Sequence, residues 1–211
     1  GKSEEYIKNS CIPEFYAGID YKHENFQAGI GAEVLSLKPR TQNTVDGKVY
    51  KLDERITSMS FEAHLRYKTP DWLVAAKSTL GENMTHTCML GGYGVTSIDA
   101  RTGEQTYTPF RHSMTWLNVV HGQKWKQGLF VGYMKNLGTG EDIINQYGTG
   151  LEVGQLLTVD LQLSYNLPHW KFGLEYSPST GWFGTADNRG CIHDTHTVTN
   201  HRILTAMIYM F

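Results

Sequence analysis

The stretch LLTVDLQLSYNLPHWKFGLEYSP, residues 156–178, decides the fold because apolar and polar side chains alternate along both of its arms. In the first arm Leu157, Val159 and Leu161 would share one face of an extended strand, and the polar residues between them would lie on the other face. The second arm repeats this period of two from Trp170 onward. We therefore predict a β-hairpin with one apolar and one charged face. Its apolar face needs a neighbour, which is either a protein core or lipid.

The composition excludes some classes of protein and leaves others open. The chain has 211 residues and a formal net charge of −2, with a sequence pI near 6.5. It therefore lacks the basic excess of a nucleic-acid-binding protein. It contains 22 glycines, 12 tyrosines and 5 tryptophans but only 6 prolines, and its mean hydropathy is −0.39. A soluble all-β domain and a porin-type barrel would both have this composition.

Short segments of the sequence give further information about the class of protein. The chain has no apolar run of about 18 residues, which excludes a transmembrane helix, whereas alternating barrel strands would average to mild polarity. The first residues, GKSEEYIKNS, include neither Met nor the apolar core of a signal peptide, so we expect a mature form or a fragment. Cys11, Cys88 and Cys191 form no CxxC motif, and a disulfide between two of them stays open.

The same alternation recurs along the chain and predicts nine spanning strands. These strands are 13–22, 25–38, 54–68, 71–80, 106–121, 124–137, 155–167, 169–178 and 197–211. A rival interpretation adds Thr87–Ile98 as a tenth strand. Short turns alternate with long connections, which we expect on the outer side of the protein: 38–53, 80–107, 138–154 and 177–197.

Aromatic side chains recur at a fixed spacing across three of the short turns. Tyr21 and Phe26 are five residues apart, as are two later pairs, Tyr67 with Trp72 and Tyr165 with Trp170. Strands in general favour aromatic residues, but equal spacing in three hairpins is typical of the girdle at a membrane interface. The predicted girdle consists of Tyr21, Phe26, Tyr67, Trp72, Trp125, Tyr165, Trp170, Tyr209 and Phe211.

The C-terminal strand carries a family resemblance. It ends on Phe211, with Tyr209 and Met207 at alternate positions, and so resembles the assembly signal of outer-membrane β-barrel proteins. With the hairpin pattern, the chain is similar to porin-like barrels of Gram-negative bacteria, and TWLNVV, GLFVGY and NLGTG resemble loops of the Bacteroidota. The resemblance implies the bacterial outer membrane and contact with its lipid and lipopolysaccharide. It also implies recognition of the C-terminal strand by the barrel-assembly machinery.

The fold class we predict is all-β, a transmembrane antiparallel up-and-down β-barrel in a single domain over residues 1–211. Bacterial barrels normally have an even number of strands and both termini in the periplasm. Nine strands break that rule, so we expect the chain to be the C-terminal part of a larger barrel. The last strand is apolar on both faces, which hints at a homo-oligomer or a partner subunit.

Charged residues of both signs fall on the polar faces of the strands. In a lumen they would set ion preference; in a small closed barrel they would instead form a salt-bridge network that fills the interior. The predicted pore-lining residues are Lys22, Glu33, Glu62, His64, Arg66, Lys77, Asp160, Lys171, Glu175 and Arg202.

Catalytic and metal motifs are sparse, so we predict no enzymatic activity, cofactor or metal. His112, Ser113, Asp194 and His196 lie near predicted rims without a spacing that joins a nucleophile to a base. Metal-capable residues occur in Cys191-x-His193-Asp194-x-His196 and at His201, in a loop-like stretch with no recognised ligand spacing.

The leading functional hypothesis is a porin-like channel for passive diffusion of small hydrophilic solutes. One alternative is an outer-membrane barrel with a closed lumen, whose outer loops bind a partner or ligand. Another is a soluble β-sandwich or calyx with a ligand cavity.

Overall fold

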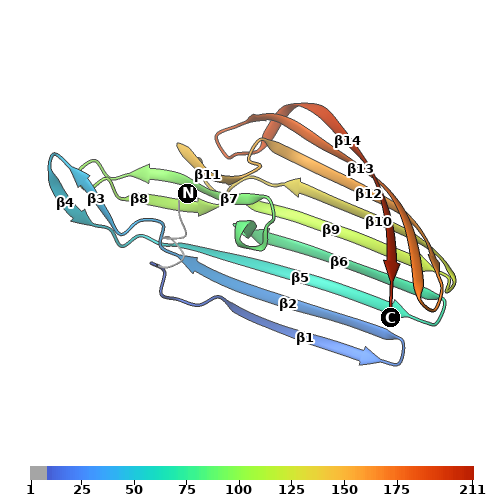
Figure 1. Cartoon of the computed structure of the whole chain (residues 1–211). Helices are drawn as coiled ribbons and strands as arrows, with labels where there is room; N and C mark the ends of the chain where they lie inside the picture. Colours follow the sequence, from blue (N-terminus) through green and yellow to red (C-terminus); the bar gives the residue numbers. More distant parts are fainter. Residues whose placement is uncertain (1–8) are drawn as a thin grey trace.

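In the computed structural model, which describes residues 9–211, nine strands form one antiparallel sheet (Figure 1). Its order along the sheet is β1 (Phe15–His23), β2 (Phe26–Leu37), β5 (Ile56–Lys68), β6 (Trp72–Glu82), β9 (Arg111–His121), β10 (Trp125–Asn136), β12 (Val153–Asn166), β13 (Trp170–Ala186) and β14 (Ile192–Tyr209). The prediction of an all-β, up-and-down antiparallel sheet is confirmed.

Four short turns lie together at one end of this sheet, at residues 24–25, 69–71, 122–124 and 167–169. We call this end the short-turn rim. The first hairpin keeps an unbroken register from Phe15 opposite Val34 to His23 opposite Phe26. Its two-residue turn includes Glu24 at φ 45°, a left-handed conformation that suits a tight hairpin.

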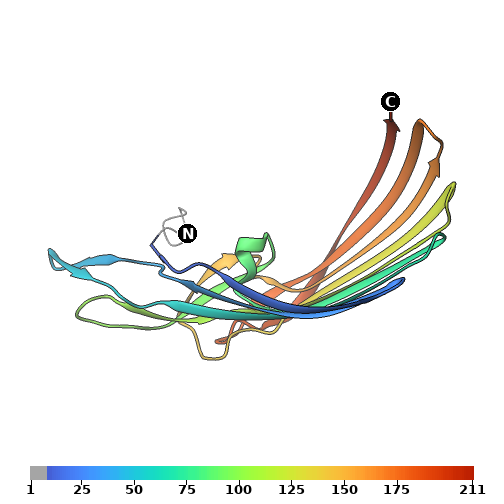
Figure 2. The same cartoon turned by 90° about the horizontal axis from the view of Figure 1, so that it is seen from below.

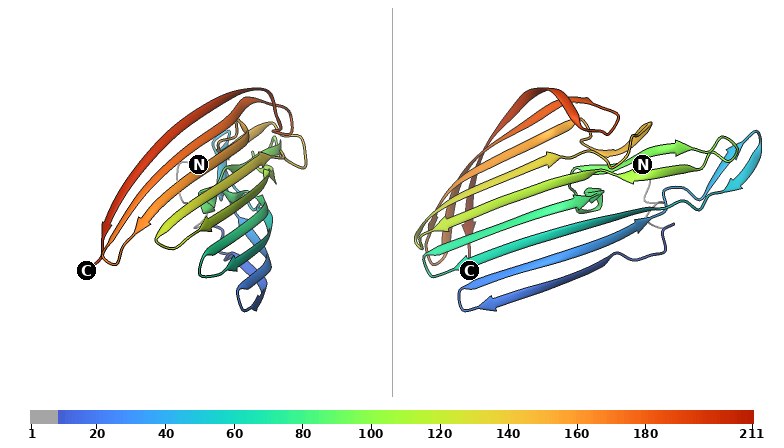
Figure 3. Two further views of the ribbon diagram at one scale, coloured as in Figure 1. Left: turned by 90° about the vertical axis from the view of Figure 1, so that its right-hand side faces the viewer. Right: turned by 180° about the vertical axis from the view of Figure 1, so that it is seen from behind.

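The sheet curves into an open trough, and β1 and β14 are its two edges (Figures 2 and 3). The larger barrel that we predicted stays a prediction, and the nine strands of the described residues are not closed on one another. Strand direction explains why. β1 and β14 both run toward the short-turn rim, because His23 lies opposite Phe26 and Tyr209 opposite Trp170. Joining these two edges directly would make a parallel pair in an otherwise antiparallel sheet.

Two small sheets lie beyond the opposite end of the trough. One has the order β11 (Asn145–Thr149), β7 (Gly91–Ile98), β8 (Gln105–Pro109), and the other pairs β3 (Gln42–Val45) with β4 (Lys48–Lys51). A single 3-10 turn, η1 (Met84–Thr87), follows β6. No helix in the described part of the chain has the length and apolar character needed to cross a membrane.

These elements correct several sequence-based boundaries. The rival ten-strand interpretation is wrong, because β7 belongs to the separate sheet. The predicted strand 106–121 is divided, since β8 joins that sheet and only β9 joins the trough. The predicted loops 38–53, 80–107 and 138–154 contain short strands rather than loop alone.

The predicted loop 177–197 is also wrong. β13 continues to Ala186 and β14 begins at Ile192, so this segment is mostly one extended hairpin. Polar β-branched residues explain why this segment is a strand pair although its sequence was interpreted as a loop. Thr180 lies opposite Thr199, and their hydroxyl oxygens are 2.9 Å apart. Threonine favours strands without adding the apolar alternation that we searched for.

A compact apolar core joins the small sheet to the trough. Leu35, Leu37 and Ile56 are buried at the ends of β2 and β5, and Tyr93 and Tyr107 pack against them. The rings of Tyr93 and Tyr107 meet edge to face with centroids 5.4 Å apart. Burial of the phenol raises the pKa of Tyr107 to about 12.

Close approach of two backbones between β7 and β11 generates the first prediction. A Cβ on Gly148 would lie 2.0 Å from the carbonyl oxygen of Gly91. Gly148→Ala should therefore cost about 1–3 kcal/mol of unfolding free energy and separate the two strands. The matched control is Gly140→Ala, whose Cβ would meet only Thr108 Oγ1 at 3.9 Å. Hydrogen exchange of the β7 amides measures the effect, and equal protection in both variants would contradict this packing.

Candidate functional site: the charged concave face

The two faces of the trough differ in character, and η1 identifies which is concave. The segment with η1 lies on the inner side of the curved sheet (Figure 2). There Ser60 Oγ donates a hydrogen bond to Met84 Sδ at 3.0 Å. Because successive residues of a strand point to opposite faces, Glu62 and His64 share the concave face with Ser60. The register of each strand pair then assigns the residues of the other strands to a face. All ten predicted pore-lining residues lie on the concave face.

A first charged cluster surrounds Glu62 on β5. The Tyr16 hydroxyl donates to Glu62 Oε1 at 2.8 Å, and the Lys77 ammonium pairs with the same carboxylate. His64 Nε2 lies 2.9 Å from Asp20 Oδ1, and its Nδ1 lies 3.8 Å from Glu62 Oε1. The cluster thus connects β1, β5 and β6 across the intervening strand.

Two glycines of β2 make room for this cluster. A Cβ on Gly31 would lie 2.3 Å from the Tyr16 hydroxyl oxygen, and one on Gly29 would lie 2.4 Å from Asp20 Oδ1. The side chains of β1 therefore reach β5 by crossing the bare backbone of β2. Tyr16 and Asp20 were missed in the sequence, although Gly29 and Gly31 at facing positions were a signal for them.

A second cluster occupies the other side of the trough. Arg202 donates to Glu175 Oε1 at 2.6 Å, and Gln162 donates to Glu175 Oε2 at 2.8 Å. Asp160 accepts a hydrogen bond from Ser177. This cluster links β12, β13 and β14, so the predicted residues form two networks rather than one.

The remaining predicted lining residues lie outside these networks. Glu33 is near the end opposite the short-turn rim, with its Oε1 3.1 Å from His86 Nε2. Lys22, Arg66 and Lys171 lie near the rim, and none makes an ion pair with another residue of 9–211. The rim side of the concave face is therefore the more basic.

The convex face is apolar and uncovered. Large side chains on all parts of it are exposed, including Ile19 at 76% and Ile203 at 71%. At the short-turn rim, aromatic rings pair between neighbouring hairpins, with centroids 4.5 Å apart for Trp125 and Tyr165 and 4.8 Å for Trp170 and Tyr209. The structure thus brings the predicted girdle residues to one rim, and their role at a membrane interface stays a prediction.

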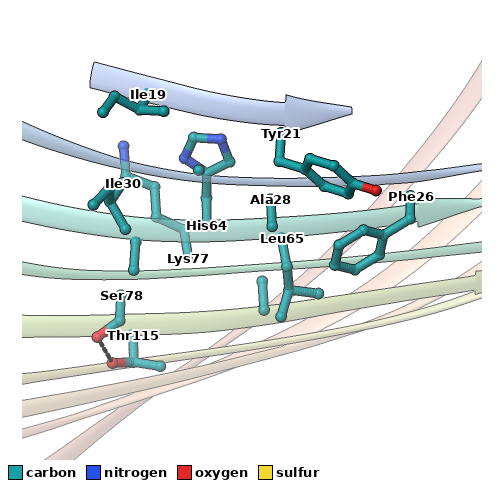
Figure 4. Close-up of a pocket in the computed structure, with 13 residues that line it drawn as sticks. Ile19, Tyr21, Phe26, Ala28, Ile30, His64, Leu65, Lys77, Ser78 and Thr115 are labelled. Atoms are coloured by element: carbon teal, nitrogen blue, oxygen red, sulfur yellow. Dashed lines mark hydrogen bonds between the residues drawn. The ribbon is translucent and has the colours of Figure 1, made fainter. Parts of the chain in front are cut away.

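A shallow hollow of about 590 Å³ lies on the convex face near β1 (Figure 4). Small residues of neighbouring strands create it, and Ser78 and Thr115 form a hydroxyl pair 2.9 Å apart within it. Larger side chains, among them Ile19, Tyr21 and Phe26, also line it, and His64 and Lys77 of the charged cluster contribute to its lining from the other face. This lining suits contact with apolar groups.

The weak catalytic and metal candidates are dispersed. His112 is fully buried, whereas its neighbour Ser113 points to the other face of β9. His196 stacks on Phe183 with centroids 6.2 Å apart, and His201 Nδ1 lies 2.8 Å from the Tyr176 hydroxyl.

Beside them, Asp187 organises the turn between β13 and β14. Its carboxylate lies 3.0 Å from His193 Nε2 and accepts backbone N–H groups of Arg189 and Cys191. The hydrogen bond with His193, followed by those backbone bonds, lowers the pKa of Asp187. Within residues 9–211 the set from Cys191 to His201 does not converge into a metal cluster.

Comparisons with known proteins give one structural likeness. No protein-family model matches the chain, and no curated protein matches it in sequence. Among solved structures, the chain is similar to OmpT (in-vitro folded), an outer membrane protein of Vibrio cholerae, with a TM-score of 0.49 and 13% identity. The match covers 93% of this chain and 56% of that chain, so the present chain spans little more than half of that protein.

This likeness bears on two earlier expectations. The fold resembles that of an outer membrane protein, whereas the link to the Bacteroidota stays a prediction. The prediction that the chain is not an enzyme is corrected, because the comparison with this outer membrane protein gives that prediction no support.

The environment of Glu62 generates a stability prediction. Its side chain is only 17% exposed, so Lys77→Met leaves an enclosed carboxylate without its cation. We expect a loss of about 1–3 kcal/mol of unfolding free energy. Lys22→Met, at an exposed position of the same face, should change it by less than about 0.5 kcal/mol. Urea unfolding in detergent compares the two variants, and equal losses would argue against the cluster.

Proposed function

We propose that this chain forms part of the wall of a bacterial outer-membrane β-barrel and lines a channel for passive diffusion of small hydrophilic solutes. The observation that supports this function best is the division of the sheet into an exposed apolar convex face and a charged concave face. The lipid-facing and lumen-facing surfaces of a porin wall have these two characters.

The convex face supports contact with lipid. Monomeric soluble proteins rarely expose contiguous apolar patches of more than a few hundred Å², whereas here exposed large apolar residues occur from β1 to β14. Leu161 of β12 and Leu174 of β13 are each 50% exposed. Acyl chains would cover these residues, and the aromatic rim would lie at the level of the headgroups.

Strand direction supports a larger barrel. Because β1 and β14 run the same way, fully antiparallel closure requires an odd number of further strands. Nine plus an odd number gives an even total, as in bacterial barrels. A barrel well above eight strands leaves room for water between its walls.

Several partners follow from this proposal. Outer-membrane lipid and lipopolysaccharide would contact the convex face, and the barrel-assembly machinery would recognise β14. The hollow near β1 offers an apolar surface to a second subunit in a homo-oligomer. An origin in the Bacteroidota belongs to the same proposal and rests on the loop sequences alone.

One observation favours a second candidate, a barrel with a closed lumen whose outer parts bind a partner. The connection from β6 to β7 places η1 on the concave face, and Met84 of η1 is buried against Ser60 and Gly81. A wall segment folded inward in this way narrows the space that a solute would cross.

The assignment of neighbouring residues to opposite faces of the sheet can be tested in a bilayer. Leu161→Arg on the convex face should cost roughly 2–4 kcal/mol of stability in a bilayer, because the guanidinium would face hydrocarbon. Gln162→Arg, one residue on and facing the concave side, should be tolerated. Urea unfolding of the protein in lipid vesicles measures both variants. Equal costs, or a wild-type protein that stays monodisperse without detergent, would contradict the membrane assignment.

Conductance in a planar bilayer tests the channel. We expect stepwise currents from the full-length protein. Glu175→Gln should shift the reversal potential in a salt gradient toward anion preference, because Arg202 loses its carboxylate partner. The control is Glu152→Gln, an exposed residue just before β12. Absence of steps from the wild-type protein would favour the closed lumen, and an identical shift in the control would remove Glu175 from the lining.

A further inference from the structure

Three ligand-type side chains from separate segments converge at the end of the concave face opposite the short-turn rim. Glu14 directly precedes β1, Glu33 lies on β2, and His86 lies in η1. His86 Nε2 is 3.1 Å from Glu33 Oε1 and 3.5 Å from Glu14 Oε2. One donor atom from each residue lies within 4.8 Å of the other two.

An imidazole hydrogen bond does not account for this arrangement by itself. Nε2 carries at most one proton, yet two carboxylate oxygens face it. No lysine or arginine of residues 9–211 pairs with either Glu14 or Glu33. Two carboxylates held this close repel each other unless a positive charge, on a protonated His86 or on a bound cation, lies between them.

The donor set and its spacing fit a small divalent transition-metal ion. Zinc binds His nitrogen and carboxylate oxygen at about 2.0–2.2 Å in a tetrahedron, which places neighbouring ligand atoms about 3.3–3.5 Å apart. The two distances from His86 Nε2, 3.1 and 3.5 Å, lie close to that value. Three protein ligands would leave one position for solvent, and Glu14, with 42% of its side chain exposed, lies on the open side.

The fold presents His86 in a defined conformation. Asn83 and Cys88, which flank η1, both have left-handed backbones at φ 51° and 61°, and Met84 anchors the turn against Ser60. The side chains of His86 and Glu33 are only 19% and 14% exposed. The turn therefore holds the imidazole against the wall of the trough rather than in solvent.

We propose that Glu14, Glu33 and His86 form a binding site for a divalent transition-metal ion of the zinc type. The bound ion ties the η1 segment to β2 and to the start of β1. This site goes beyond the proposed channel function, since it needs only these three segments in their present positions.

Calorimetric titration with Zn²⁺ alone, on the full-length protein folded in detergent, tests the site. We expect one equivalent to bind. His86→Ala and Glu33→Gln should each weaken binding more than about 100-fold, beyond the 10–100-fold typical of an outer-shell partner. The matched controls are His23→Ala and Glu24→Gln at the first turn, an imidazole and a carboxylate at the opposite end of the sheet. Both should bind like the wild-type protein.

Limited proteolysis gives an independent readout. Zn²⁺ should slow cleavage within residues 84–90 of the wild-type protein and leave the His86→Ala variant unprotected, because only the former can clamp η1. Circular dichroism verifies that each variant keeps its β structure. Three results would overturn the site: no binding to the folded wild-type protein, unchanged binding in both ligand variants, or equal weakening in the His23 and Glu24 controls.

Discussion

The pleat of the nine-stranded sheet is the constraint on which the other features of this protein depend. Each residue of a strand is assigned to one face by its parity, and an unbroken antiparallel register carries that assignment from β1 through the first hairpin to β2. A one-residue slip would exchange the apolar and charged faces. The first six strand pairings, from β1 to β12, contain no bulge. This regular register therefore decides which side chains lie on the convex face and which lie inside the trough.

That constraint also limits what the concave face can hold. Side chains on one face of neighbouring strands lie only about 5 Å apart, so a network of long side chains needs empty positions beside it. β2 supplies them with Gly29 and Gly31, over which Tyr16 and Asp20 extend. On the other side of the trough, Gln162 and Arg202 both approach Glu175 from adjacent strands. On the concave face, glycines therefore lie beside long polar side chains. Most of its ion pairs lie near the middle of the strands.

The sequence predicted the features that depend on the alternation of apolar and polar residues along the strands. The strands, their order, the four short turns and the facing of residues such as Glu62 and Lys77 all follow from alternation and tight-turn chemistry. Structural features that produce no such alternation in the sequence were not predicted. The outer half of β14 is rich in threonine and histidine, so apolar and polar residues do not alternate along it. The meeting of Glu14, Glu33 and His86 depends on a turn with left-handed flanks at Asn83 and Cys88, and nothing in local composition fixes where such a turn will lie.

The length of β14 carries a further meaning. At about 3.3 Å per residue, its 18 residues extend close to 60 Å, whereas crossing hydrocarbon takes only about 9–11 tilted residues. The strand changes character along that length: Ile192 to Arg202 is largely polar, and Ile203 to Tyr209 is largely apolar. In the proposed membrane, this change in composition along β14 indicates the depth at which the strand enters the bilayer. The bilayer surface would lie near Arg202. The part of the β13–β14 hairpin beyond Arg202 would extend into water as a two-stranded ribbon.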